Sequence, residues 1–125
     1  SFERNNALQS ELALEDKLAQ PIYREENFTP DLMSPAETQS KLGLAFLCDF
    51  LPAEDPYEAF CLQILSQLLL AGPNAPFYKS VIEQGKAPQF CPGAGFDHTT
   101  RQATFTLGVQ GVSEKDFKSL EEVLF

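Results

Sequence analysis

The stretch from Leu68 to Gly111 constrains the fold of this chain most, because several kinds of local signal follow one another closely. A leucine-rich helical pattern stops at Gly72-Pro73, and a second helical pattern begins at Asn74 and ends at Gly85. A glycine-rich extended segment, Phe90–Phe96, then precedes a strand with strict two-residue alternation from Ala103 to Gln110. Turn residues lie between the last two segments, so we expect them to form an antiparallel hairpin.

The flanking segments extend this pattern. Residues 41–48 alternate between large and small side chains, which predicts a strand. Asp55-Pro56 is a helix-start signature, and apolar residues at three- and four-residue spacings predict a helix from residue 56 to about residue 71. Ser113 and Asp116, arranged much as in a capping box, predict a last helix. The sequence therefore predicts an α+β fold, an antiparallel sheet with helices packed on one face.

We expect two regions of different character. Residues 1–40 form an irregular lead-in, in which Leu8, Leu12, Leu14 and Leu18 permit a short amphipathic helix before Pro21. Residues 41–125 form a partial α+β domain. The last predicted helix has no stop signal before the chain ends, so we expect the domain to be truncated.

Charge and apolar patterning exclude several classes of partner. The 125 residues carry a net charge of −9, most of it in the first half, and such a negative field repels nucleic acid and attracts cationic ligands. No apolar run approaches the length of a membrane span, so we expect no membrane insertion. Three cysteines without paired spacing favour a reducing compartment over a disulfide framework.

The sequence offers no catalytic residue and no metal site. His98 is the only histidine, whereas catalytic zinc normally has three protein ligands. A nucleophilic pair of Cys91 and His98 lacks a third orienting group, and we interpret them as a strand cysteine and a turn histidine that do not meet. The glycines at 93 and 95 precede a strand, not a helix, which excludes a phosphate-binding loop.

Three features allow a binding interpretation beside a structural one. The apolar stripe from Tyr57 to Leu69 is interpreted as core, being too wide for a ligand groove. The acidic group around that helix start is interpreted as a solvated helix N-terminus, with a docking patch for basic peptides as the alternative. It consists of Asp49, Glu54, Asp55 and Glu58. The segment from Pro92 to Gly95 is either a structural bulge or an edge where a peptide adds as an extra strand.

Two strings carry a resemblance to a known family. Leu70-Ala-Gly-Pro-Asn-Ala-Pro-Phe-Tyr-Lys79 and Thr104-Phe-Thr-Leu-Gly-Val-Gln-Gly111, in this order, resemble the second domain of presequence-degrading zinc metallopeptidases of the inverted-motif (pitrilysin) superfamily. Tyr57-Glu-Ala-Phe60 adds to the resemblance, which covers about residues 40–125. It implies a domain of the LuxS/processing-peptidase-like metallohydrolase fold.

The resemblance also implies a function and a site. The parent enzyme would be a mitochondrial matrix endopeptidase that degrades presequences and other short unfolded peptides. Its zinc would be held by H-x-x-E-H and a further Glu in another domain, so this chain would bind no zinc and be inactive by itself. The second domain would form chamber wall and substrate exosite, with basic amphipathic peptides and the remaining domains of the parent chain as partners. The implied exosite residues are Leu70, Ala71, Gly72, Gly93, Ala94, Gly95 and Phe96.

Two non-enzymatic alternatives stay open. The same superfamily includes scaffold subunits of a respiratory complex, which keep the fold and have lost the zinc site. A self-standing peptide-binding module is the other alternative. The presence or absence of H-x-x-E-H in a longer reading frame would separate the first alternative from a peptidase.

Overall fold

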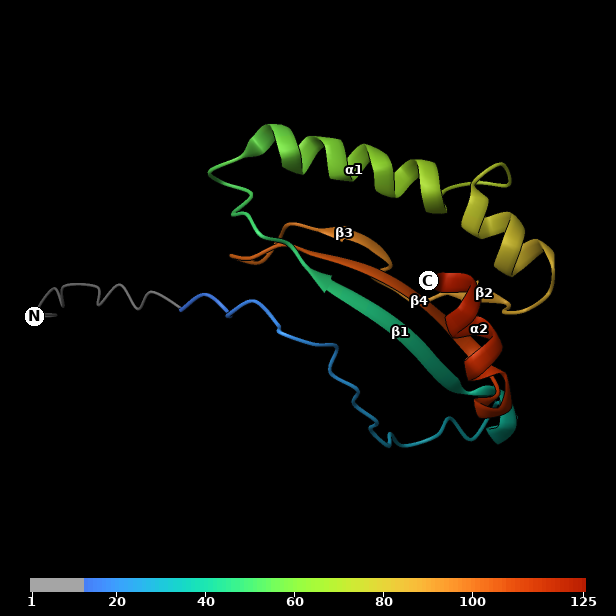
Figure 1. Ribbon diagram of the computed structural model, residues 1–125. Coiled ribbons are helices and arrows are strands. Elements are labelled where there is room, and N and C mark those ends of the chain that lie inside the picture. The colour runs from blue at the N-terminus through green and yellow to red at the C-terminus, as the bar shows by residue number, and fades with distance from the viewer. Residues whose placement is uncertain (1–12) are drawn as a thin grey trace, which may run out of the picture.

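The computed structural model describes residues 13–125 and has a small antiparallel sheet at its centre (Figure 1). Its elements follow the predicted order. They are the 3₁₀ turn η1 (Ala36–Thr38), β1 (Ser40–Leu47), α1 (Pro56–Leu70), the π-helical segment η2 (Tyr78–Glu83), β2 (Gln89–Phe90), β3 (Gly95–Asp97), β4 (Thr104–Val112), the 3₁₀ turn η3 (Glu114–Asp116) and α2 (Phe117–Leu124). The predicted α+β class is therefore confirmed.

The long strand β4 is the middle of the sheet. It pairs antiparallel with β1 along one side and with both β2 and β3 along the other. The register places Leu42, Leu44 and Phe46 opposite Val109, Leu107 and Phe105. Side chains alternate between the two faces of a strand, so these six residues form one apolar face.

The core lies between this apolar face and the helical segments. Val81 of η2, Val109 of β4 and Leu120 of α2 are fully buried, and Leu107 and Leu124 join the same cluster. Burial of side chains of this size stabilises the fold by about 1.5–3 kcal/mol each. On the other face of β1, Lys41, Gly43 and Ala45 are exposed, so the helices cover one face of the sheet, as predicted.

The start of α1 was correctly predicted at the level of single atoms. Asp55 is the N-cap, and its Oδ1 accepts a hydrogen bond from the backbone N–H of Glu58 at 3.0 Å. Pro56 opens the helix, where its missing N–H costs nothing.

The apolar stripe of α1, however, is not core, which contradicts the sequence-based interpretation. Five of its large side chains are between 42% and 76% exposed: Tyr57, Phe60, Ile64, Leu65 and Leu68. The helix instead turns a narrower side inward, on which Ser66 is buried and Leu70 packs against the core. Helical spacing shows that a stripe exists, but it does not show what covers it.

Two local predictions were wrong in detail. The segment after Asn74 does not form a regular α-helix capped by that residue. It forms η2, whose N-cap residue is Phe77 and makes no side-chain hydrogen bond to the helix. Pro76 lies in the first turn, where its missing N–H costs nothing, but the backbone is α-helical only at Pro76 and Phe77 before it widens into η2. At η3, Ser113 makes no side-chain cap; its backbone oxygen accepts from the N–H of Asp116 at 3.0 Å.

Leu14 and Leu18 of the lead-in lie in irregular chain, and the rest of the permitted N-terminal helix lies outside the described residues.

Candidate functional site

The structure brings the two halves of the predicted exosite together. α1 lies along β3, so the C-terminal turn of the helix meets the glycine segment (Figure 1). A side-chain carbon placed on Gly95 would overlap Ser66 Oγ and would lie 3.5 Å from Leu70 Cδ1. Leu70 and Gly95 are therefore neighbours although 25 residues separate them in the sequence.

The glycine segment is an interrupted edge strand. β2 and β3 both pair with β4, and between them the backbone N–H of Ala94 donates to the oxygen of Cys91 at 3.1 Å in a tight turn. This is close to the bulged ribbon that Pro92 and the glycines predicted. Whether it also receives a peptide is a separate question.

The outer side of β3 already has one partner. The backbone N–H of Phe96 donates to Ser66 Oγ at 3.1 Å. A donor that would be available to an added strand is thus satisfied by α1. The accessible part of the predicted exosite, called the shelf below, consists of Ala71, Gly72 and Gly93, which are exposed, whereas Gly95 is buried.

Sequence reasoning missed Ser66. It is the one buried polar residue of the described chain, 8% exposed, and it fixes the distance between α1 and β3. A short polar residue within a leucine-rich helix was the available signal, because such a residue on the inward side needs a hydrogen-bond partner.

Three rings stack beside this shelf. The Phe50 and Phe96 ring centroids are 6.3 Å apart, and the Phe96 and His98 centroids are 5.8 Å apart. Offset stacking at such distances holds the β1–α1 and β3–β4 loops together. His98 thus has a packing role. Burial raises the pKa of the Cys91 thiol, which disfavours the thiolate that nucleophilic chemistry requires.

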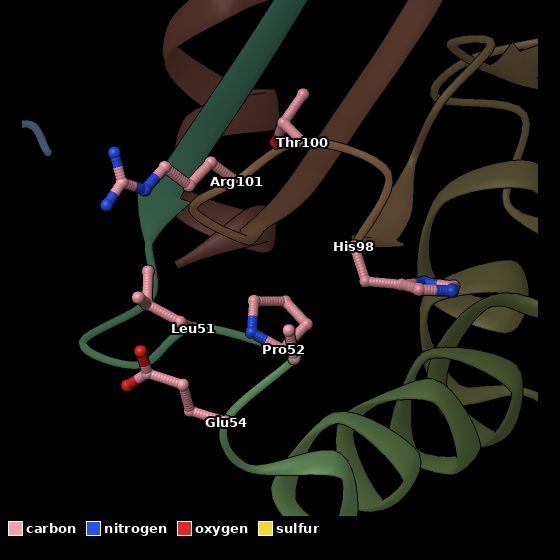
Figure 2. A pocket seen from close by; sticks show the side chains of 7 residues that line it. Leu51, Pro52, Glu54, His98, Thr100 and Arg101 are labelled. Carbon is pink, nitrogen blue, oxygen red and sulfur yellow. The ribbon is translucent and has the colours of Figure 1, made fainter. Parts of the chain in front are cut away.

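A shallow pocket of about 300 Å³ opens between the same two loops (Figure 2). Leu51, Pro52 and Glu54 line one side, and His98, Thr100 and Arg101 line the other. Figure 2 shows the side chains of His98 and Arg101 pointing in opposite directions, so these two polar groups do not converge on a common point. Catalysis requires such convergence, and the pocket therefore has the character of a loop junction.

The acidic group at the start of α1 is accounted for in part by local structure. Asp49 Oδ2 forms an ion pair with Lys17 Nζ at 2.8 Å, and Asp55 is the helix cap. Both partners of the ion pair are more than 70% exposed, so the pair contributes little to stability.

Two kinds of site are absent from the part of the chain that the structure describes. Residues 13–125 contain no cluster of three or more His, Cys, Asp or Glu side chains able to hold a metal ion. No helix in this range is long and apolar enough to cross a membrane.

The described residues form one α+β unit, an antiparallel sheet with helices packed against one face. Comparison with known proteins gives the family: residues 5–125 match the model described as "Peptidase M16 inactive domain". The chain belongs to this family.

The curated relatives include mitochondrial presequence proteases from distant eukaryotes. The mouse protein is 42% identical over 112 residues, which cover 85% of this chain and 11% of the relative. The zebrafish protein is 41% identical over 96 residues, covering 76% and 9%. The Schizosaccharomyces pombe protein is 35% identical over 94 residues, covering 75% and 9%. The chain thus spans about a tenth of the length of the relatives it matches.

Proposed function

We propose that this chain forms part of a zinc metalloendopeptidase of the mitochondrial matrix that degrades presequences and other short unfolded peptides. The observation that carries the proposal is the 42% identity to the mouse presequence protease across 85% of the chain. The family match, to an inactive domain, is consistent with a non-catalytic part of such an enzyme.

The residues described here do not fit a zinc ion, because they contain no suitable cluster and the whole chain has a single histidine. Zinc and the chemistry of peptide hydrolysis would belong to other parts of the peptidase. This chain would act by shaping the wall of the substrate chamber.

Within that wall, we assign substrate contact to the shelf at the end of α1 and the glycine turn. The assigned residues are Leu70, Ala71, Gly72, Gly93, Ala94, Gly95 and Phe96. Ala71, Gly72 and Gly93 are exposed, and exposed backbone groups bind peptides of varied sequence. The net charge of −9 would concentrate basic amphipathic peptides near this surface.

The proposal is tested with the intact protein that contains this chain and a basic fluorogenic peptide. We expect cleavage that stops when zinc is chelated and resumes when zinc is restored. An intact protein that folds, binds no zinc and cleaves no peptide would instead support the scaffold alternative.

The exosite is tested separately by a matched pair of variants, Ala71→Lys and Ala71→Glu, in the intact protein. Ala71 is exposed, so neither substitution disturbs the core. We expect Ala71→Lys to lower kcat/KM for the basic peptide about two- to tenfold relative to Ala71→Glu, because like charges repel. A peptide with its lysines replaced by glutamine serves as control and should not distinguish the variants. Equal kcat/KM for the basic peptide in both variants would contradict the assignment.

A further inference from the structure

The outer edge of β1 is an open strand edge. In the part of the chain that the structure describes, β1 pairs with β4 alone. The Cys48 N–H donates to the Ala103 oxygen at 2.9 Å, which fixes the direction of the backbone groups at this end of the pair. Hydrogen bonding alternates along an antiparallel strand, so Leu42, Leu44 and Phe46 bond to β4. The outward-facing backbone groups are those of Lys41, Gly43, Ala45 and Leu47.

Most of this edge lacks the features that usually protect an exposed strand. The register shifts between Ser40 and Lys41, and Lys41 is the one charged residue, but residues 42–47 pair with β4 in continuous register and contain no proline and no charge. The opposite edge is different, because it is divided between β2 and β3 and Ser66 satisfies the N–H of Phe96. Natural proteins pair, cover, bulge or charge a long edge, since an open one binds other strands.

The apolar face of the sheet also continues past this edge. Leu42 and Leu44 are half-buried, and Phe46 is 45% exposed although its cross-strand partner Phe105 is packed against the core. A strand beside β1 with apolar residues at alternate positions would cover Phe46 and extend the same face. The face therefore specifies the side-chain pattern of the missing neighbour.

We propose that the outer edge of β1 binds an extended strand from the remainder of the peptidase chain, with apolar side chains alternating beside Leu42, Leu44 and Phe46. The source follows from length, because the curated relatives are about ten times as long as the segment they share with this chain. The inference rests on the proposed larger peptidase, but not on its substrate or on the exosite.

The test is amide hydrogen exchange, resolved to single residues, in the intact protein and in the 125-residue chain. In the intact protein we expect the outward amides of Gly43 and Ala45 to be protected about as strongly as the inward amides of Leu42 and Leu44. In the 125-residue chain, protection of the inward pair shows that β1 and β4 are formed. There the outward pair should exchange on the order of 100-fold faster than the inward pair.

A proline pair supplies an independent readout in the intact protein. Ala45→Pro removes only an outward donor, whereas Leu44→Pro removes a donor to β4 and is the control for a broken sheet. We expect both to lower the Tm of the intact protein, and Ala45→Pro to be tolerated in the 125-residue chain.

The inference is overturned if Gly43 and Ala45 exchange rapidly in an intact protein whose Leu42 and Leu44 are protected. It is also overturned if Ala45→Pro leaves the Tm of the intact protein unchanged while Leu44→Pro lowers it. Neither readout involves peptide cleavage, so failure here differs from failure of the proposed function.

Discussion

Gly95 allows α1 to pack closely on the sheet, because it has no side chain. Its φ of 116° lies where side chains are strained, and a side-chain carbon there would overlap Ser66 Oγ. Gly93 has a similarly unusual φ of 83°, but open space surrounds it. A substitution at Gly93 therefore measures the cost of backbone strain alone, whereas a substitution at Gly95 measures backbone strain together with a steric clash.

We expect Gly95→Ala to lower the free energy of unfolding by about 2–4 kcal/mol and Gly93→Ala by about 1 kcal/mol. The measurement is urea denaturation followed by circular dichroism. Adding Ser66→Ala to Gly95→Ala removes the overlapping hydroxyl and should recover part of the loss, even though it also removes the bond to Phe96. Equal losses at positions 93 and 95 would show that α1 does not approach β3 as described.

The half-buried cysteines Cys48 and Cys91 give a prediction about pH. Burial raises the pKa of the Cys48 thiol, with the nearby charges of Asp49 and Glu58 adding to the effect, and burial also raises the pKa of Cys91. A raised pKa means less thiolate, so both residues should react with iodoacetamide more slowly than glutathione does at pH 8. Their reactivity should reach its midpoint at a higher pH than in the same chain unfolded in urea.

The same shifts affect stability. The folded state holds the thiol proton more tightly than the unfolded state does. The protonated thiols therefore contribute to the free energy of unfolding at neutral pH, and this stabilisation is lost as pH rises past the raised pKa. Mass spectrometry of the alkylated peptides resolves the two sites. Coincident pH profiles for folded and unfolded chain would show that neither thiol is buried.

Among the elements, α1 and α2 differ in what their leucines do. Leu68 of α1 is 65% exposed and Leu120 of α2 is fully buried. The same substitution, leucine to alanine, should therefore cost about 2–5 kcal/mol at position 120 and less than about 1 kcal/mol at position 68. Urea denaturation of the two variants measures the difference. A large loss at position 68 would place the α1 stripe in the core after all.

The extent to which the elements could be predicted depended on whether their signals were local. Alternation in β1 and β4 and the cap at Asp55 are properties of a few consecutive residues, and these predictions were correct. The position of α1 was not predictable, because Tyr57, Phe60 and Leu68 have the spacing of a core stripe whether or not anything covers them. Tertiary packing selected the side of the helix that carries Ser66.

The candidate site was likewise predictable only in part. The resemblance predicted that the end of α1 and the glycine segment lie together, and the structure places Leu70 against Gly95. It gave no indication that Ser66 satisfies the N–H of Phe96, because that bond joins residues 30 positions apart. Whether the shelf binds peptide stays a prediction.

On the scale of the whole molecule, two opposing properties determine how the chain behaves in solution. A net charge of −9 keeps copies apart at pH 7, while the α1 stripe exposes large apolar side chains that favour association. The sequence pI is about 4.4, so near this pH the electrostatic repulsion vanishes and the exposed apolar surfaces remain.

We therefore expect the chain to stay in solution at pH 7 and to aggregate near pH 4.4, measured as turbidity at constant ionic strength. The variant Phe60→Gln with Leu68→Gln removes two large exposed apolar side chains of the α1 stripe and should reduce turbidity severalfold at that pH. Leu32→Gln with Met33→Gln is the matched control, because these side chains are 95% and 92% exposed but lie in the irregular lead-in. If both variants reduce turbidity equally, total exposed apolar area governs association. A selective effect of the α1 variant would identify its stripe as the surface that must be covered in a larger assembly.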